Sequence, residues 1–573
     1  GPELSVAFDP QGIAGRVRRL DMPCFVVRNG HGVGVTNDGE LVPLAKPSEL
    51  LKPSEVPGGA VTVVAVASPI SLGALGDPEF LQCYGLQAAY MAGSMANAIS
   101  SEAMVIALGR AGLLGSFGAG GLTPQRLEEA IVRIQRALPE GPYAFNLIHS
   151  PHEPAVESRT VDLYIKHGVQ VVEASAYLAL TPHVVRYRAA GLSPDGTGGV
   201  RIGNRVIAKV SRREVAAQFL NPAPDRLLQP LVEQRMITPQ QAALARQVPM
   251  ADDITVEADS GGHTDNRPLV CLLPSIMDLR DQVQAAQGYG ATVRVGAAGG
   301  IGTPSSALAA YMMGAAYVVT GSVNHSCVEA GTSSYVKRIL AQADMADVMM
   351  APAADMFEMG VNLQVLKRGT MFPLRARKLY ELYQAYDSLE AIPGPELEKL
   401  EKQILRRSVG DVWGDCVAFF SERDPQQITR AQQDSKRRMA LVFRWYLGLA
   451  TRWAVTGETG RELDYQIWCG PAMGAFNDWV RGSRLEPPEA RQVADVAWRM
   501  MEGAALLYRL QTLKVQGARL PVYALLIGAF IRLSGHVDGG MLTLTVADDG
   551  RGGAVEHAPG ATGSGQGLRG MRQ

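Results

Sequence analysis

Eight short apolar runs, each the length of a β-strand, alternate with amphipathic stretches of helical period, and this alternation limits the fold more than any other feature. Strands separated by helices build parallel βαβ units. Eight such units are the size of a (β/α)₈ TIM barrel, so we predict an α/β protein with that barrel at its centre. The predicted barrel strands are residues 61–66, 113–117, 143–148, 170–174, 206–210, 254–258, 292–296 and 316–320.

The chain has 573 residues, more than a single hydrophobic core usually supports, so further domains are expected. We expect residues 1–60 to form a small β-rich N-terminal element and residues 61–350 to form the barrel. Residues 222–250 are too long for an ordinary connection and are interpreted as an inserted flap. Residues 351–534 contain all six tryptophans and have helical period, which predicts a helical C-terminal domain. Residues 535–573 differ in character and form an atypical tail.

The composition excludes several classes of protein. Hydrophobic residues make up 47% and charged residues 19%, which is typical of a well-packed enzyme. A formal net charge of -1 gives no general attraction to nucleic acid or to an anionic membrane. The six cysteines have no metal-ligand spacing, and no apolar run reaches the ~18 residues that cross a bilayer. A cytoplasmic protein without a metal site or a membrane segment is expected.

Two glycine-rich loops follow the last two predicted strands. Strand 7 leads into Gly299 and Gly300, and strand 8 ends in Thr320-Gly321-Ser322. Glycine lets backbone N–H groups approach an anion, and barrel enzymes often bind phosphate on these two loops. Each loop alone is equally consistent with a tight turn or a helix cap. Together they favour a phosphate site.

The loop after strand 6 carries an unusual density of polar groups. It runs from Ala258 to Pro268 (ADSGGHTDNRP) and brings His263, Asp265 and Arg267 to the end of the barrel where active sites lie. His263 is either a structural histidine or a functional one, and its place after Gly261-Gly262 favours function.

Two further side chains near strand ends have two interpretations each. Asn146, at the end of strand 3, either binds a planar heterocycle or bonds neighbouring backbone. Lys209, near the end of strand 5, either contacts a cofactor or neutralises a carboxylate such as Glu173.

These motifs carry a resemblance to a known superfamily. The loops at Ala67-Ser68-Pro69-Ile70, Asn146, Gly261-Gly262-His263, Gly299-Gly300 and Thr320-Gly321-Ser322 are similar in order and spacing to the nitronate monooxygenase and FMN-dependent enoyl reductase superfamily. The full strand 6 string and the helical C-terminal domain resemble the PfaD-type trans-acting enoyl reductases of polyunsaturated fatty acid and polyketide synthases. The resemblance covers roughly residues 12 to 530.

The resemblance implies an FMN at the barrel mouth, with its phosphate on the strand 7 and 8 loops. It implies that NADPH reduces this flavin and that an enoyl thioester on an acyl carrier protein of the synthase then receives the hydride. His263 is the candidate for stabilising the enolate or donating the proton, and Asp265 and Arg267 are candidates for setting its charge. A homodimer is also implied. The implied cofactor-binding residues are Ala67, Ser68, Pro69, Ile70, Asn146, Lys209, Gly261, Gly262, Gly299, Gly300, Thr320, Gly321 and Ser322.

An acidic carrier protein calls for a basic docking surface. Each candidate is as consistent with the solvated face of a helix as with a docking patch. The candidates are Arg375, Arg377, Lys378, Arg406, Arg407, Lys436, Arg437 and Arg438.

Two alternatives remain from the sequence. An oxygen-using nitronate monooxygenase shares the barrel, the FMN and the Gly-Gly-His motif, although a small nitronate needs no helical docking domain. A signalling or scaffold protein is suggested by the tail, because Asp548-Asp-Gly-Arg-Gly552 and Gly563-Ser-Gly-Gln-Gly567 resemble glycine boxes of histidine kinase ATP-binding domains. The similarity covers about 40 residues, too few for such a domain, so we expect the tail to be non-functional.

Overall fold

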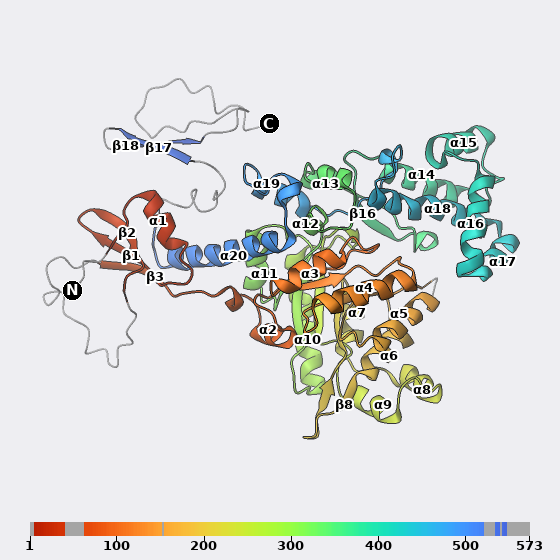
Figure 1. Ribbon diagram of the computed structural model, residues 1–573, viewed down its shortest axis with the longest axis horizontal. Helices are drawn as coiled ribbons and strands as arrows, with labels where there is room; N and C mark the ends of the chain where they lie inside the picture. Colours follow the sequence, from red (N-terminus) through yellow and green to blue (C-terminus); the bar gives the residue numbers. More distant parts are fainter. Residues whose placement is uncertain (1–4, 40–61, 152–153, 521–532, 539–540, 547–573) are drawn as a thin grey trace. The chain divides into compact units, whose positions relative to one another are not determined.

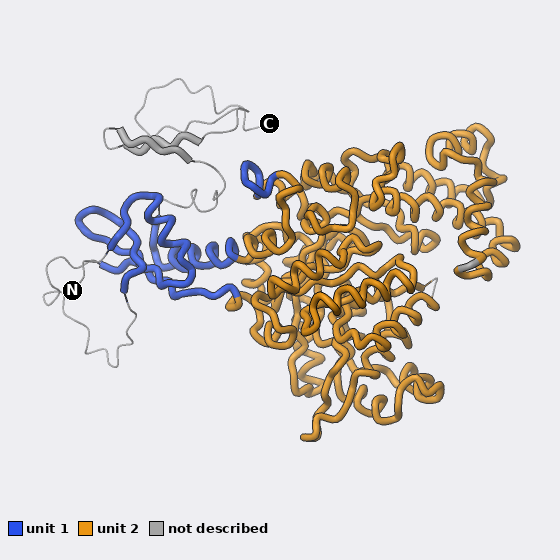
Figure 2. Tube along the Cα trace, viewed as in Figure 1, with its two compact units in different colours: residues 1–72, 480–486, 502–573 blue, residues 73–479, 487–501 orange. Residues whose placement is uncertain are grey.

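The computed structural model describes residues 5–39, 62–151, 154–520, 533–538 and 541–546. The chain divides into two compact units, as Figure 2 shows. The smaller unit comprises residues 1–72, 480–486 and 502–573, and the larger unit comprises residues 73–479 and 487–501.

Eight parallel strands close into a barrel in the larger unit, which confirms the predicted fold class (Figure 1). Their residues are almost all buried, because a barrel strand has packed side chains on its inner face and helices on its outer face. In barrel order the strands are β4 (Tyr90–Ala92), β5 (Leu114–Phe117), β6 (Ala144–Ile148), β7 (Val171–Ser175), β10 (Arg205–Val210), β11 (Asp253–Glu257), β13 (Arg294–Ala298) and β14 (Val318–Thr320).

The barrel helices begin at clear sequence signals. Thr123, Thr181 and Thr303 each cap a helix by accepting a backbone N–H, and a proline follows each of them at the first helical position. A threonine cap followed by proline is a strong helix start, because the proline φ angle already suits the helix. The helices around the barrel are α3 (Glu102–Arg110), α4 (Pro124–Ala137), α5 (Pro154–Lys166), α6 (Pro182–Ala190), α7 (Arg213–Leu220), α10 (Leu269–Gln287), α11 (Pro304–Met312) and α12 (Ser322–His325).

The first predicted barrel strand is wrong. Residues 62–67 form β3 (Thr62–Ala67), which pairs antiparallel with β1 (Cys24–Asn29) in a separate three-stranded sheet. The first barrel strand is instead β4 (Tyr90–Ala92), which pairs with β14 and β5. A three-residue strand is too short to stand out as an apolar run, whereas the longer Thr62–Ala67 run imitates a barrel strand.

Residues 222–250 are the segment that the sequence pattern predicts as an inserted flap. It contains two short helices, α8 (Asp225–Glu233) and α9 (Pro239–Ala245), which pack on α6, and α9 also packs on the short strand β8 (Leu192–Pro194). It follows α7 and precedes β11, so it lies toward the end of the barrel where strands begin. Its length reflects local packing of two extra helices.

The strand pattern also continues past residue 350, where the sequence predicts helix alone. β15 (Val348–Pro352) and β16 (Asn362–Leu366) form an antiparallel pair, and the two-residue strand β12 (Gly262–His263) adds to β16. Gly262 lies opposite Gln364 and His263 lies opposite Leu363. This small sheet therefore holds the loop that follows the sixth barrel strand.

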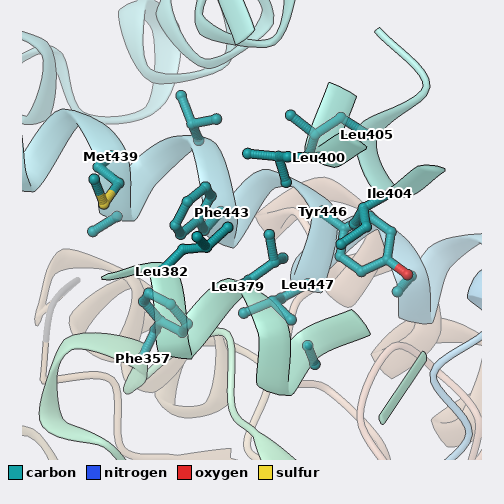
Figure 3. Packing of buried hydrophobic residues seen from close by; sticks show 14 of the residues in the cluster. Phe357, Leu379, Leu382, Leu400, Ile404, Leu405, Met439, Phe443, Tyr446 and Leu447 are labelled. Atoms are coloured by element: carbon teal, nitrogen blue, oxygen red, sulfur yellow. The ribbon is translucent and has the colours of Figure 1, made fainter. Parts of the chain in front are cut away.

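A helical group follows the hairpin, as expected for the C-terminal region. It consists of α14 (Phe372–Ala385), α15 (Gly394–Lys399), α16 (Val409–Arg423), α17 (Pro425–Gln433) and α18 (Ser435–Thr456) (Figure 1). Figure 3 shows its core, in which Phe443, Tyr446 and Leu447 of α18 pack with Leu379 and Leu382 of α14. These five residues are at most 2% exposed. Burial of large apolar side chains at this density stabilises the group.

The smaller unit joins the two ends of the chain. It contains α1 (Pro10–Val17), the sheet of β1, β2 (Gly32–Thr36) and β3, and the end of α20 (Val493–Val515) from Glu502 onward. Leu510 and Leu513 of α20 pack into the same core as Val26 and Val35 of the sheet. The predicted β-rich N-terminal element is therefore completed by a helix from the other end of the sequence.

The predicted strand at residues 541–546 is present as β18 (Met541–Val546), which pairs with β17 (Leu533–Asp538). Both glycine boxes of the tail, at residues 548–552 and 563–567, lie outside the described residues. In the part of the chain that the structure describes, none of the helices is long and apolar enough to cross a membrane.

Candidate active site

A cavity of about 1310 Å³ opens at the C-terminal ends of the barrel strands. Its wall contains residues from the loops after β4, β5, β6, β7, β10, β11, β13 and β14, and it continues along α16 and α18. Parallel strands bring the loops at their C-terminal ends together, which is why residues far apart in the sequence meet here. The cavity is larger than the ~300–1,000 Å³ typical of a site for one small molecule.

The two predicted glycine loops both reach this cavity. Gly299 and Gly300 have φ angles of 84° and 74°, which side chains rarely adopt. A Cβ at Gly299 would lie 2.6 Å from the backbone carbon of Ala258, so close packing requires glycine there. A Cβ at Gly300 or Gly321 would meet no atom within 4 Å, so these two positions present bare backbone to the cavity.

The residues beside Gly321 have different roles. Thr320 is 1% exposed, and its hydroxyl lies 2.5 Å from the Tyr90 hydroxyl and accepts from Asn324 Nδ2 at 2.9 Å. Ser322 Oγ accepts from the Gly470 N–H at 2.9 Å. Thr320 therefore fixes the end of β14, while Ser322 connects the predicted phosphate loop to a turn near the end of the helical region.

Asn146 on β6 bonds its neighbours, as the second of its two interpretations expects. Its Nδ2 donates to the Glu173 carbonyl at 3.1 Å and to Ser175 Oγ at 2.7 Å. Glu173 is fully buried on β7, and its Oε2 accepts from the Ser94 N–H at 2.8 Å. Its Oε1 has no hydrogen-bond partner among the described residues. Glu173 lines the cavity, so this oxygen is an acceptor available to a ligand.

Lys209 on β10 forms an ion pair with Glu257 on β11, with 3.0 Å between Nζ and Oε1. Burial alone would lower the pKa of Lys209, but the charges of Glu257 and Glu173 outweigh it and raise that pKa above its ordinary value. Both carboxylates and the ammonium line the cavity. The lysine is thus a carboxylate partner, chiefly of Glu257 rather than of Glu173, and it stands at the barrel mouth.

His263 lies on β12 with its imidazole in the cavity wall. Its Nε2 is 3.1 Å from Oδ1 of Asp355, which follows β15. Burial would lower the pKa of His263, but the charge and hydrogen bond of Asp355 outweigh this and raise the pKa above the ordinary histidine value. The same contact lowers the pKa of Asp355 against the effect of its burial. The pair therefore favours an imidazolium beside a carboxylate.

Asp265 and Arg267 do not set the charge of His263, contrary to the sequence-based expectation. Asp265 accepts hydrogen bonds from Arg212 at 2.8 and 2.9 Å and from Ser211 at 2.8 Å. The hydrogen bond from Arg212 is the main reason that the pKa of Asp265 is lowered. Arg267 is exposed and lies outside the residues that line the cavity. Neighbours in a loop sequence point in different directions, so spacing alone could not identify the partner.

Ala67, Ser68, Pro69 and Ile70 are also corrected. Ala67 is the last residue of β3, which belongs to the smaller unit, and the other three follow it. None of the four is part of the cavity wall. The loop after the true first barrel strand begins Gly93-Ser94-Met95-Ala96, and these residues do line the cavity. Because the first barrel strand was misassigned, the residues inferred from it lie outside the cavity wall.

Most side chains of the predicted basic docking surface have partners within the chain. Six of them form ion pairs with carboxylates, and Arg437 bonds the neutral amide of Gln427. The pairs are Arg375 and Arg406 with Asp464, Lys378 with Glu396, Arg407 with Asp415, Arg437 with Gln427, Lys436 with Asp387, and Arg438 with Glu390.

Two features of the site were not predicted from the sequence. Asp355 comes after a short strand in a region where the sequence predicts helix, so nothing placed it near His263. The turn Cys469-Gly470 packs against Gly261, because a Cβ on Gly261 would lie 2.8 Å from the Cys469 nitrogen. A Cβ on Gly470 would likewise lie 2.7 Å from the Gly261 nitrogen. Glycines at both positions are the one sequence signal of this close backbone contact.

The fold and the site define a (β/α)₈ barrel protein with two glycine loops and a histidine at the barrel mouth. Residues 1–51 match the family described as fatty acid synthase subunit PfaD N-terminal domain. Residues 386–465 match the inserted helical domain of [acyl-carrier-protein] S-malonyltransferase. The first match falls in the smaller unit and the second in the helical group.

Similar proteins narrow the class further. The crystal structure of the enoyl reductase domain of MlnA from the macrolactin biosynthesis cluster of Bacillus amyloliquefaciens is 40% identical, with a TM-score of 0.73. The match covers 77% of this chain and 100% of that one. The chain therefore belongs to the PfaD-type enoyl reductase family.

Longer relatives are more similar in sequence. One of the polyunsaturated fatty acid synthase subunits of Thraustochytrium sp. is 52% identical over 81% of this chain, and polyketide biosynthesis protein PksE of Bacillus subtilis is 46% identical over 77%. The chain spans 31% of the length of the first relative and 57% of the second.

Proposed function

We propose that this chain is an FMN-dependent enoyl reductase that acts in trans on an α,β-unsaturated acyl thioester carried by an acyl carrier protein. NADPH is the proposed hydride source, and a polyketide or polyunsaturated fatty acid synthase is the proposed partner. The supporting observation is one cavity that contains bare backbone at Gly300 and Gly321, the His263 and Asp355 pair, and a branch with aromatic side chains along α16 and α18. The names of the relatives agree with this proposal.

The residues of the cavity fit FMN. Bare backbone at Gly300 and Gly321 suits the phosphate, since a side chain at either position would occupy the space of the phosphate oxygens. The unpartnered Oε1 of Glu173 is an acceptor for an N–H or O–H donor, and FMN carries both kinds of donor. When bound, FMN supplies the transfer of hydride between the nicotinamide and the β-carbon of the enoyl group.

His263 is the proposed acid of the reaction. Nε2 is held by Asp355, so Nδ1 is the ring nitrogen that meets a substrate. An imidazolium at this place donates a hydrogen bond to the thioester oxygen and can deliver the proton that the α-carbon requires. Asp355 stabilises the charged ring and fixes its orientation. The ion pair between Lys209 and Glu257 forms another polar part of the cavity wall.

A cytoplasmic setting is part of the proposal. The six cysteines Cys24, Cys83, Cys271, Cys327, Cys416 and Cys469 are all free thiols. Free thiols are typical of a reducing compartment.

The test compares two activities of the FMN-loaded full chain. We expect anaerobic, NADPH-dependent loss of the double bond of crotonyl-pantetheine or crotonyl-carrier protein, measured by mass spectrometry. We expect no comparable aerobic consumption of nitroethane. Fast oxygen-dependent nitroethane oxidation without reduction of either thioester would replace this proposal with the nitronate monooxygenase alternative.

A further inference from the structure

The cavity continues away from His263 into a groove whose two walls are helix faces. On α18 the wall residues Leu441, Trp445, Gly448, Leu449 and Arg452 follow helical spacing. Residues spaced by three and four positions lie on one face of a helix. The opposite face of α18 packs into the core, as Figure 3 shows for Met439, Phe443 and Tyr446. On the groove face Leu441 is nearly buried and Trp445 also packs against the core. Gly448, Leu449 and Arg452 stay partly or fully exposed, so this end of the face is available to a ligand.

The second wall is one face of α16. Cys416, Phe419, Phe420 and Arg423 line the same cavity, again at helical spacing. The thiol of Cys416 lies 3.6 Å from the Leu441 carbonyl, which joins the two walls at one point. Phe419 is 54% exposed even though it is a large aromatic residue. An exposed aromatic wall that is continuous with the barrel mouth is suited to an apolar ligand.

Gly448 has no internal reason to be glycine. It lies inside the long helix α18, where glycine is the least favourable residue after proline. Its φ is not positive, and a Cβ there would meet no atom within 4 Å. The space that a side chain would fill belongs to the cavity. Glycine at this position therefore widens the groove at the expense of helix propensity.

We propose that the groove between α16 and α18 holds the acyl chain of the substrate and that Gly448 sets the chain length and branching that it accepts. This inference rests on the proposed enoyl reductase function. The occupant is the acyl chain, because Phe419, Phe420 and Trp445 give the walls a large apolar surface. Two of the arginines in the walls already have partners, since Arg444 is paired with Glu358 and Arg423 lies over the Phe419 ring. Continuity with the wall at His263 places the reacting end of such a chain at the barrel mouth.

The first experiment changes the width of the groove in the FMN-loaded full chain. The substrates are crotonyl-pantetheine and trans-2-dodecenoyl-pantetheine. For Gly448→Leu we expect kcat/KM for the dodecenoyl substrate to fall at least about 10-fold more than for the crotonyl substrate, since a leucine occupies the volume of several methylene groups.

A matched control is available on the neighbouring helix. Gly414 lies inside α16, a Cβ there also meets no atom within 4 Å, and it is not part of the cavity wall. Gly414→Leu should therefore leave the ratio of the two kcat/KM values within about 2-fold of the wild type. Equal losses on both substrates in Gly448→Leu, or the same ratio change in Gly414→Leu, would overturn the proposal.

A second measurement does not depend on turnover. Calorimetric titration with saturated dodecanoyl-pantetheine and butyryl-pantetheine should show tighter binding by about 3- to 4-fold for each additional buried methylene group. Phe419→Asp places a charge on an exposed wall residue without disturbing the core, and it should abolish this chain-length gain. The absence of a chain-length gain in the wild type would also exclude the groove as the acyl site.

The outcomes separate the two proposals. Chain-length-dependent binding without reduction of either enoyl thioester would refute the enoyl reductase proposal and keep the groove. Reduction of crotonyl-pantetheine together with no chain-length dependence, in either binding or turnover, would refute the groove and keep the reductase.

Discussion

The pair His263 and Asp355 gives the clearest prediction at the scale of single residues. We expect His263→Ala to retain FMN but to slow enoyl reduction on the order of 10²-fold, the usual contribution of a positioned acid. The rate of flavin reduction by NADPH should fall much less, because the proposed proton transfer belongs to the second half of the reaction. Stopped-flow absorbance at the flavin band measures both halves. Equal effects on the two halves would return His263 to a structural role.

Asp355→Asn tests the partner through the pH profile. Asp355 raises the pKa of His263, so the imidazolium persists to higher pH in the wild type and enoyl reduction falls as the pH rises through that pKa. Removing the carboxylate should move this alkaline limb to lower pH. Asp265→Asn is the matched control, because Asp265 bonds Arg212 instead, and it should leave the limb in place. If the alkaline limb moved in Asp265→Asn but not in Asp355→Asn, Asp355 would not be the residue that sets the pKa of His263.

Gly300 provides the corresponding test of the phosphate site. Gly300→Leu should reduce bound FMN to less than about a tenth of the wild-type content, because the side chain enters open cavity space at a position with φ 74°. Gly288→Leu is the control for backbone strain, since Gly288 has φ 65° and open space but lies outside the cavity. Absorbance of the purified proteins measures the FMN content. Full FMN content in Gly300→Leu would show that the phosphate binds elsewhere.

At the scale of elements, seven of the eight barrel strands were predictable, because buried parallel strands are continuous apolar runs with caps and prolines between them. β4 was not predicted, because a strand of three residues is too short to form a recognisable apolar run. The longer apolar run of β3 was taken as the first barrel strand instead. The same limit applies to the site. The glycine loops and His263 were visible as local motifs, whereas Asp355 meets His263 through the pairing of β12 with β16, which is a long-range contact.

The contact between the β12 loop and the Cys469-Gly470 turn gives an element-scale prediction. Gly470→Ala would place a Cβ 2.7 Å from the Gly261 nitrogen, and the backbone has little room to move. We expect this overpacking to destabilise the protein by about 1–3 kcal/mol and to lower reductase activity. Gly414→Ala in α16 is the control, and it should be neutral or stabilising by up to ~1 kcal/mol. Thermal unfolding followed by circular dichroism measures the stability of both variants. A Gly470→Ala protein as stable as the wild type would refute the close contact.

At the scale of the whole molecule, the smaller unit depends on both ends of the sequence. Arg509 of α20 is 1% exposed, and its guanidinium donates to the carbonyls of Val17, Arg19, Leu20, Met22 and Ser68 at 2.7 to 3.2 Å. Burial lowers the pKa of Arg509, and the carbonyl oxygens provide its polar partners. A helix from one end of the chain therefore satisfies the backbone of the other end, which no local sequence pattern predicts.

Two truncations test this division of the molecule. Ending the chain after Met501 removes Arg509 together with Leu510 and Leu513, which are each 1% exposed in the core of the smaller unit. Buried leucines are worth about 2–5 kcal/mol each, so their loss approaches the ~5–15 kcal/mol that stabilises a typical domain. We expect residues 5–39 to become sensitive to limited proteolysis.

Ending the chain at Ser534 removes residues 535–573 and keeps α20 whole. The protein shortened in this way should keep its protease resistance, FMN content and reductase activity. The intact chain should not hydrolyse ATP. Loss of FMN or activity in the chain that ends at Ser534, or ATP hydrolysis by the intact chain, would show that the tail has a function. Protease resistance of residues 5–39 in the chain that ends at Met501 would show that α20 is not what stabilises the smaller unit.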